Sequence, residues 1–179
     1  MDNNTLNANA EEQGLSLPVS LGVLVGLSVV LGAFVGMNHY LGIQSTWLGF
    51  LLLWYWGMEK QIDFNVLITS VLPGSFIGLG TAYLIHAGPQ MFGTPGLVVG
   101  LSALILVILL TLIKKLAVLV NASTFLVLCV VLIPVVGKTN ADFLDYIKSI
   151  VSFAIFFGAI GWGLPRLIMY KMSKADDNS

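Results

Sequence analysis

Two long runs without a charged side chain decide what this chain can fold into. No Asp, Glu, Lys or Arg occurs from Gln13 to Met58, or from Phe64 to Ile113. About 20 apolar residues suffice for a helix to span the hydrocarbon core of a bilayer. Charged residues make up 9% of the chain, against roughly a quarter in soluble domains. The sequence therefore predicts an all-α, polytopic membrane protein.

Charge and residue inventory exclude several classes of function. A formal net charge of −1 gives no basic footprint for nucleic acid. The single cysteine, Cys129, excludes an internal disulfide. We find no motif spacing typical of an enzyme, and His39 and His86 are too few for a metal site. We therefore expect neither an enzyme nor a cofactor, and a pH-sensing role for the two histidines stays open.

Polar residues, glycine and proline divide the apolar sequence into six predicted transmembrane helices. Residues 1–17 are predicted to form a disordered tail, 18–172 the transmembrane domain and 173–179 a C-terminal tail. The third and fourth helices are separated by an expected loop at His86–Pro89. The helices are expected at about Pro18–Leu41, Ser45–Met58, Asn65–Ile85, Pro95 to beyond Lys115, Ser123–Gly137 and Phe143 to about Tyr170.

Two further features concern the helices themselves. Pro73 and Pro134 each lack an N–H and predict kinks in the third and fifth helices. The cluster Trp54–Trp56 ends the second helix, where aromatic side chains are expected to anchor at the membrane interface. A hydrophobic constriction is the alternative for this cluster.

The distribution of basic residues predicts the orientation in the membrane, because cytoplasmic loops carry an excess of Lys and Arg. Two basic residues, Lys138 and Lys148, fall on one side of the six-helix arrangement. The other six fall on the opposite side, which places both termini in the cytoplasm: Lys60, Lys114, Lys115, Arg166, Lys171 and Lys174.

The chain contains an internal repeat. The segment Gly22–Ser28 recurs as Gly96–Ser102 with five of seven residues identical, at an offset of 74. Ser45–Leu48 recurs as Ser123–Leu126 at an offset of 78, and Asp63, Phe64 and Ser70 recur as Asp142, Phe143 and Ser149 at 79. The repeats cover about 18–86 and 94–170, with three helices each. An odd number inverts the second copy, so the chain predicts a 3+3 inverted repeat with a path between the copies.

The first helix of each repeat carries small residues four apart. Such patterns let helix backbones approach closely in a membrane, so we expect packing within or between subunits. A pore lined by backbone carbonyls is the alternative. The residues are Gly22, Gly26 and Ser28 in one copy, and Gly96, Gly100 and Ser102 in the other.

The second helix of each repeat begins with a Ser-Thr-aromatic motif preceded by an amide side chain. These predicted helices have about 14–15 residues, or roughly 21–23 Å, which is less than the ~30 Å hydrocarbon core. The motif is either an ordinary interfacial N-cap or a helix end sunk in the protein, where free N–H groups favour a polar or anionic solute. The candidate path residues are Gln44, Ser45, Thr46 and Trp47, with Asn121, Ser123, Thr124 and Phe125.

The run Ser70–Gly78, together with Trp47–Phe50, resembles a DUF1097-type family of small multi-pass membrane proteins. The resemblance implies a bacterial inner-membrane protein without an assigned substrate, and it transfers no functional residues.

These patterns together favour a passive channel or facilitator for a small polar or anionic solute, acting as a homo-oligomer. The alternative is a non-transporting membrane protein that binds or organises a membrane partner through its Gly-rich helix faces.

Overall fold

The computed structural model describes residues 17–60, 63–113, 116, 118–135 and 141–176, and within these residues all regular structure is helical, joined by short turns, without strands. Residues 1–16 of the predicted tail 1–17 lie outside the described residues, and Leu17 is already helical. Lys114, Lys115 and Lys138 also lie outside them, as do the side chains of Lys60, Lys171 and Lys174. In chain order the elements are α2 (Leu17–Tyr40), α3 (Thr46–Lys60), α4 (Phe64–Val66), the π-helical segment η1 (Leu67–Val71), α5 (Leu72–Phe92), α6 (Thr94–Thr111), α7 (Ala122–Val135) and α8 (Phe143–Asp176).

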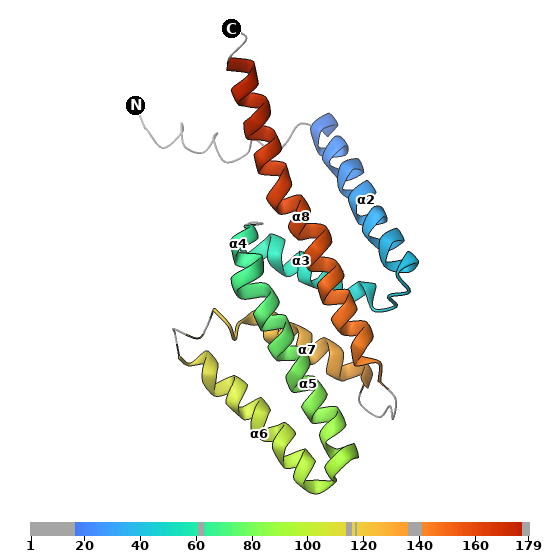
Figure 1. The fold of residues 1–179 in the computed structure, drawn as a ribbon, viewed down its shortest axis with the longest axis vertical. Coiled ribbons are helices and arrows are strands. Elements are labelled where there is room, and N and C mark those ends of the chain that lie inside the picture. Colours follow the sequence, from blue (N-terminus) through green and yellow to red (C-terminus); the bar gives the residue numbers. More distant parts are fainter. Residues whose placement is uncertain (1–16, 61–62, 114–115, 117, 136–140, 177–179) are drawn as a thin grey trace, which may run out of the picture.

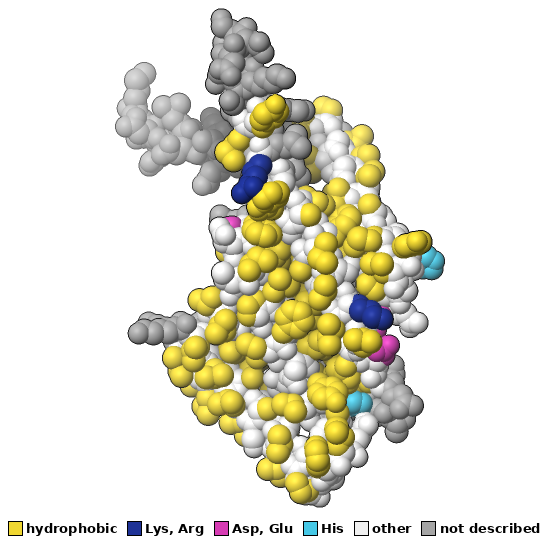
Figure 2. Space-filling view, viewed as in Figure 1, with side chains coloured by type: hydrophobic (Ala, Val, Ile, Leu, Met, Phe, Trp, Pro, Cys, Tyr) yellow, Lys and Arg dark blue, Asp and Glu magenta, His cyan; other side chains and the backbone are white. Residues whose placement is uncertain are grey.

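Four stretches are long and apolar enough to cross a membrane: Pro18–Tyr40, Phe64–Phe92, Thr94–Thr111 and Phe143–Gly163. The helices α3 and α7 have 15 and 14 residues, so they are shorter than a full span at 1.5 Å per residue. On the face in Figure 2, hydrophobic side chains dominate and charged ones are few. Exposed apolar side chains on this scale are typical of a membrane protein.

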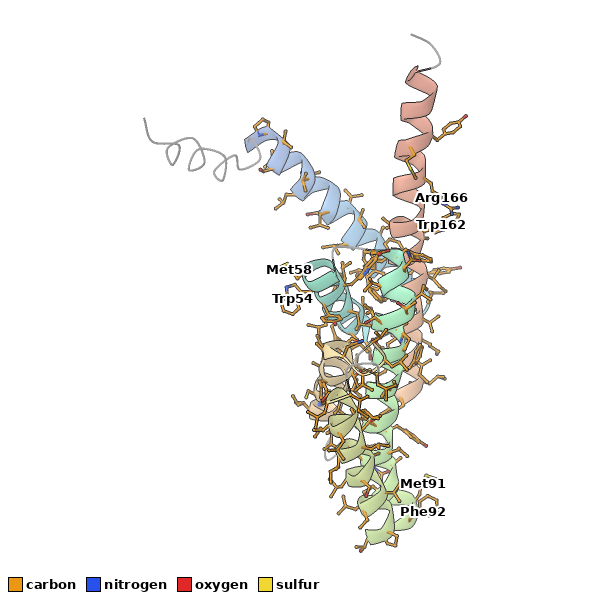
Figure 3. All side chains as sticks on the ribbon, turned by 90° about the vertical axis from the view of Figure 1, so that its left-hand side faces the viewer. Trp54, Met58, Met91, Phe92, Trp162 and Arg166 are labelled. Carbon is orange, nitrogen blue, oxygen red and sulfur yellow. The ribbon has the colours of Figure 1, made fainter. Side chains whose placement is uncertain are left out.

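The helices α5 and α6 pack along each other, whereas α2 contacts α8 only near its C-terminal end. In Figure 1, α6 lies beside α5, and the short helices α3 and α7 run across the long ones. The short helix α3 packs on α8, and α7 packs on α5. Figure 3 shows α2 and α8 diverging toward the N-terminal end of α2, where residues 18–29 are exposed.

Aromatic side chains fill the centre of the fold. Phe34 of α2 is fully buried, and its ring centroid lies 4.9 Å from that of Phe157 in α8. Trp56 is 1% exposed and donates its indole N–H to the carbonyl of Asp63, at 3.0 Å. The expectation that Trp54–Trp56 all lie at the interface is therefore wrong for Tyr55 and Trp56. Trp54 alone of the three projects from the surface, as Figure 3 shows.

Two predicted boundaries around α6 are wrong. The predicted loop at His86–Pro89 is helical, because α5 continues to Phe92. Pro89 has no N–H to donate, but its carbonyl still accepts the N–H of Gly93 at 2.9 Å, and Gly88 lies close against the backbone of Gly96. The turn falls instead at Gly93, whose φ of 63° is a conformation that glycine adopts without strain.

The other end of α6 also differs from the expectation. The helix ends at Thr111 and does not continue past Lys115. The N–H groups of Leu112 and Ile113 bond to carbonyls three residues earlier, which tightens the last turn and stops the α-helical pattern. The end of α6 was not predictable from the sequence, because neither Gly nor Pro stands there.

The chain around Pro73 departs from an α-helix, as the missing proline N–H predicts. The segment η1 ends at Val71, two residues before Pro73, and the Leu72 N–H bonds to the carbonyl of Leu67, five residues back. A π-helical turn widens the helix and turns backbone carbonyls outward. The structure thus offers polar backbone groups at this point of the third predicted span.

Candidate functional site

The second Ser-Thr motif, at Ser123 and Thr124, joins α7 to the π-helical segment η1 through hydrogen bonds. The Oδ1 of Asn121 accepts hydrogen bonds from the backbone N–H of Ser123, at 2.8 Å, and from its hydroxyl, at 2.6 Å. The Nδ2 of Asn121 donates to the carbonyl of Ser70 at 2.9 Å, and the Ser123 hydroxyl shares its single proton with the carbonyl of Val71, at 3.1 Å. Asn121 therefore caps α7 and binds it to η1.

Glycines of α5 seal this contact. A side chain on Gly74 would collide with the Ser123 hydroxyl, and one on Gly78 would collide with the carbonyl of Thr124. Ser123 and Thr124 are fully buried, and Phe125 is half-buried. Small residues that admit a close helix approach are typical of membrane helix packing. The second motif is thus occupied by helix–helix contacts.

The first Ser-Thr motif is capped from a residue that sequence reasoning missed. The carboxylate of Asp145, in the first turn of α8, accepts the N–H of Gln44 at 3.0 Å and the N–H of Ser45 at 2.7 Å. Asp145 is 7% exposed. Bonds between a carboxylate and the free N–H groups of a helix start are charge-assisted. Asp145 stands inside a predicted span, a position that by itself marks a candidate functional residue.

A line of polar side chains follows Asp145 along one face of α8. Residues 145, 149 and 152 share a face because they follow the i, i+4, i+7 spacing of a helix. The Ser149 hydroxyl donates to the carbonyl of Ser45 at 2.7 Å, and the Ser152 hydroxyl donates to Oδ1 of Asn38 in α2. We call Asp145, Ser149 and Ser152 the α8 polar stripe. All three are buried, so the stripe places polar side chains in the interior of the protein.

Asn38 ends the stripe with an unsatisfied donor. Its side chain is fully buried, and among the described residues its Nδ2 has no hydrogen-bond partner. A buried donor without a partner costs about 1–3 kcal/mol. Such a cost in a native fold requires a reason, and function is one of them.

A cavity of about 310 Å³ opens at the Asp145 end of the stripe. We call it the Asp145 cavity. It lies beside the end of α7, where Pro134 and Val135 line it. Thr46 does not line it; its hydroxyl bonds to the carbonyl of Ile43 at 3.2 Å. The polar and aromatic residues that line it are Gln44, Ser45, Trp47, Asp142, Asp145 and Tyr146.

A second hollow of about 400 Å³ adjoins the first one. Asp142 lines both, and the second also contains His86 and Gln90, whose Nε2 atoms lie 3.1 Å apart. Within the described part of the chain, no group of three or more His, Cys, Asp or Glu side chains could hold a metal ion.

The two small-residue motifs have different surroundings within the chain. In α6, Gly96 and Gly100 lie against the backbone of Gly88 and Ile85 in α5. In α2, a methyl group on Gly22 or Gly26 would meet nothing within 4 Å. Ser28 and Ser102 are both exposed.

Comparison with known proteins gave no match to this chain among protein-family models, curated proteins or solved structures. The resemblance to a DUF1097-type family therefore stays a prediction.

Proposed function

We propose that this protein is an integral membrane protein that gives a small polar solute a passive passage across the bilayer. The observation that carries the proposal is the α8 polar stripe, which is buried within the candidate span Phe143–Gly163. Ionisable and polar side chains inside a membrane span are costly, and those retained there commonly mark a solute path. The stripe begins at the Asp145 cavity, where Gln44 and Trp47 are exposed and a solute can reach it.

The unpartnered amide of Asn38 supports the same proposal. A polar solute that passes along the stripe brings acceptor atoms for this donor, so the cost of leaving it unpaired is recovered during passage. The contact at Asn121 and Ser123 differs in this respect. Its side chains have hydrogen-bond partners, and Gly74 and Gly78 pack closely against them. This arrangement fits a role in holding helices together.

The proposal includes a 3+3 inverted repeat in a bacterial inner membrane, with both termini cytoplasmic and the chain in a homo-oligomer. Contacts of the repeat-equivalent residues Ser70 and Ser149 support the repeat: Ser70 accepts a bond from Asn121 before α7, and Ser149 donates one to Ser45 before α3. Cysteines in place of Lys60 and Lys138 test the inversion. Impermeant thiol reagents should label them from opposite sides of the membrane, and labelling of both from one side contradicts it.

A flux assay with a matched pair of variants tests the passage itself. Cys129 is the one cysteine, so a Cys129→Ser background gives a protein without thiols. Gln44→Cys places a thiol at the rim of the Asp145 cavity. Ala122→Cys is the control, because it is the repeat-equivalent position, also exposed, at the start of α7. Each protein is reconstituted in vesicles, and entry of small neutral, cationic and anionic solutes is followed by light scattering.

At least one solute should enter faster than it enters empty vesicles. A bulky thiol reagent should block that entry in Gln44→Cys and leave it intact in Ala122→Cys. Flux equal to that of empty vesicles for every solute contradicts the passage, and equal block in both variants removes the Asp145 cavity from the path.

The exposed face of α2 favours a second candidate function, which is binding of a membrane partner. Residues 18–29 are exposed on every side of the helix, including Gly22 and Gly26. The same motif in α6 is covered by α5. Cross-linking in native membranes tests this candidate, with Gly22→Ile expected to abolish a cross-link that the wild-type chain forms through α2.

A further inference from the structure

The charges around the Asp145 cavity favour one class of solute. At the start of α3 the Asp145 carboxylate already accepts the N–H groups of Gln44 and Ser45, and at the start of α7 the amide oxygen of Asn121 accepts the N–H of Ser123. An anion at the start of α3 would therefore meet the negative charge of Asp145. Two carboxylates, Asp142 and Asp145, line the cavity, and none of the described residues lining it is basic.

The two carboxylates differ in what remains free for a ligand. Asp145 is buried and directs one oxygen to the Gln44 N–H and the other to the Ser45 N–H. Asp142 is exposed, and its Oδ1 accepts the N–H of Asp145 in a longer bond of 3.2 Å. Asp142 is thus the carboxylate available for direct contact, and Asp145 adds negative charge behind it.

Aromatic rings stand beside these carboxylates. The centroids of Trp47 and Tyr146 lie 6.1 Å apart with their planes at 76°, so the two rings form a corner in the cavity wall. The Tyr146 ring also lies beside the ring of Phe143, with the two ring centroids 6.0 Å apart. Ring faces carry negative charge density and attract cations within about 6 Å, with Trp the strongest of them.

Size restricts the ligand further. Pockets for drug-sized molecules range over about 300–1,000 Å³, so a cavity of about 310 Å³ takes a small one. A bare metal ion needs more oxygen or nitrogen ligands than Asp142 and its neighbours offer. An organic ammonium group needs fewer directed ligands, because a carboxylate and aromatic faces are sufficient for it.

We propose that the Asp145 cavity binds a small organic cation, with its ammonium group between the Asp142 carboxylate and the rings of Trp47 and Tyr146. The inference rests on the proposed function and names the solute class of that same site. Gln44 borders the cavity with an amide that can hydrogen-bond a hydroxyl or carbonyl elsewhere on the ligand.

Binding is measured on the purified full-length protein in detergent, by calorimetry and by Trp fluorescence. The probe is tetramethylammonium chloride, and tert-butanol is the neutral control of similar size. Asp142→Asn removes the charge but keeps an N-cap residue, since Asn caps helices about as well as Asp. Asp63→Asn is its matched control, because Asp63 is the repeat equivalent and also caps a helix start, where it accepts the N–H of Asn65 at 2.9 Å.

Tetramethylammonium should bind saturably and tert-butanol should not. Asp142→Asn should weaken binding about tenfold or more, a typical effect of losing one partner of a desolvated cation. Trp47→Leu should weaken it by a similar factor, while Trp47→Phe retains part of the affinity and Phe125→Leu, at the repeat-equivalent position, changes nothing. Circular dichroism identifies any variant that fails to fold. If Trp47→Leu does not fold, the affinity of Trp47→Phe is compared with that of the wild type instead.

Equal binding of tert-butanol overturns the proposal, and so does an unchanged affinity in Asp142→Asn or an equal loss in Asp63→Asn. Failure here is distinguishable from failure of the passage. If neutral solutes enter the vesicles but tetramethylammonium does not bind, the organic-cation proposal is rejected and the passage is retained. Saturable binding without entry of any solute retains the cation site and rejects the passage.

Discussion

The hydroxyl of Ser149 donates a hydrogen bond of 2.7 Å to the carbonyl oxygen of Ser45, although 104 positions separate the two residues in the chain. This bond and the Asp145 carboxylate together hold the start of α3 against α8. The contact between Ser70 and Asn121 does the same for η1 and α7. Each short helix is therefore tied at its N-terminus to the long helix of the other repeat.

Ser149→Ala should destabilise the protein by about 0.5–1.5 kcal/mol, the net value of one buried hydrogen bond. The loss stays small because the Ser45 carbonyl also accepts the N–H of Leu48, at 3.0 Å. Thermal unfolding in detergent measures it. Ser28→Ala is the control: its hydroxyl bonds only to Leu24 in the exposed part of α2, and the midpoint should stay unchanged.

Gly78→Ala should destabilise the protein by about 1–3 kcal/mol, because the added methyl group collides with the backbone carbonyl of Thr124. Gly80→Ala is the matched control in the same helix. Nothing lies within 4 Å of its added methyl group, so it should be neutral or stabilise by up to about 1 kcal/mol. If both variants unfold at the same temperature, the close approach of α5 and α7 is contradicted.

The two repeats should respond differently to the same glycine change. Gly96→Ala forces apart the backbones of α5 and α6 at Gly88 and should lower the unfolding temperature. Gly22→Ala, at the equivalent position of α2, should leave the purified chain unaffected or slightly more stable, since it meets nothing within the chain. A large loss of stability for Gly22→Ala in the isolated chain would mean that α2 is packed.

Stability and passage should separate in the double variant Asn38→Leu with Ser152→Ala. It removes both partners of a buried polar pair and the unpaired Nδ2, so stability should stay the same or rise by about 1 kcal/mol. Solute entry into vesicles should nevertheless fall, because the variant interrupts the α8 polar stripe. Unchanged entry would assign these side chains to packing alone.

Part of this structure was predictable from the sequence. The uncharged runs predict apolar helices of spanning length, since only apolar side chains tolerate a bilayer core. The missing N–H of Pro73 predicts an irregular helix, and η1 ends two residues before it. The two short helices are also where the Ser-Thr motifs indicate, at Thr46–Lys60 and Ala122–Val135.

The sequence alone did not reveal the function of Asp145 or the difference between the two Ser-Thr motifs. Composition reports which segments are apolar, but it does not show which face of one helix meets which face of another. Pairing between Asp145 and Ser45, or between Gly78 and Thr124, depends on how separate helices dock. The sequence therefore determined the environment and the helices. The tertiary structure decided that one motif is sealed by glycines and the other opens on an acidic, aromatic cavity, because only docking brings residues 100 positions apart within hydrogen-bond distance.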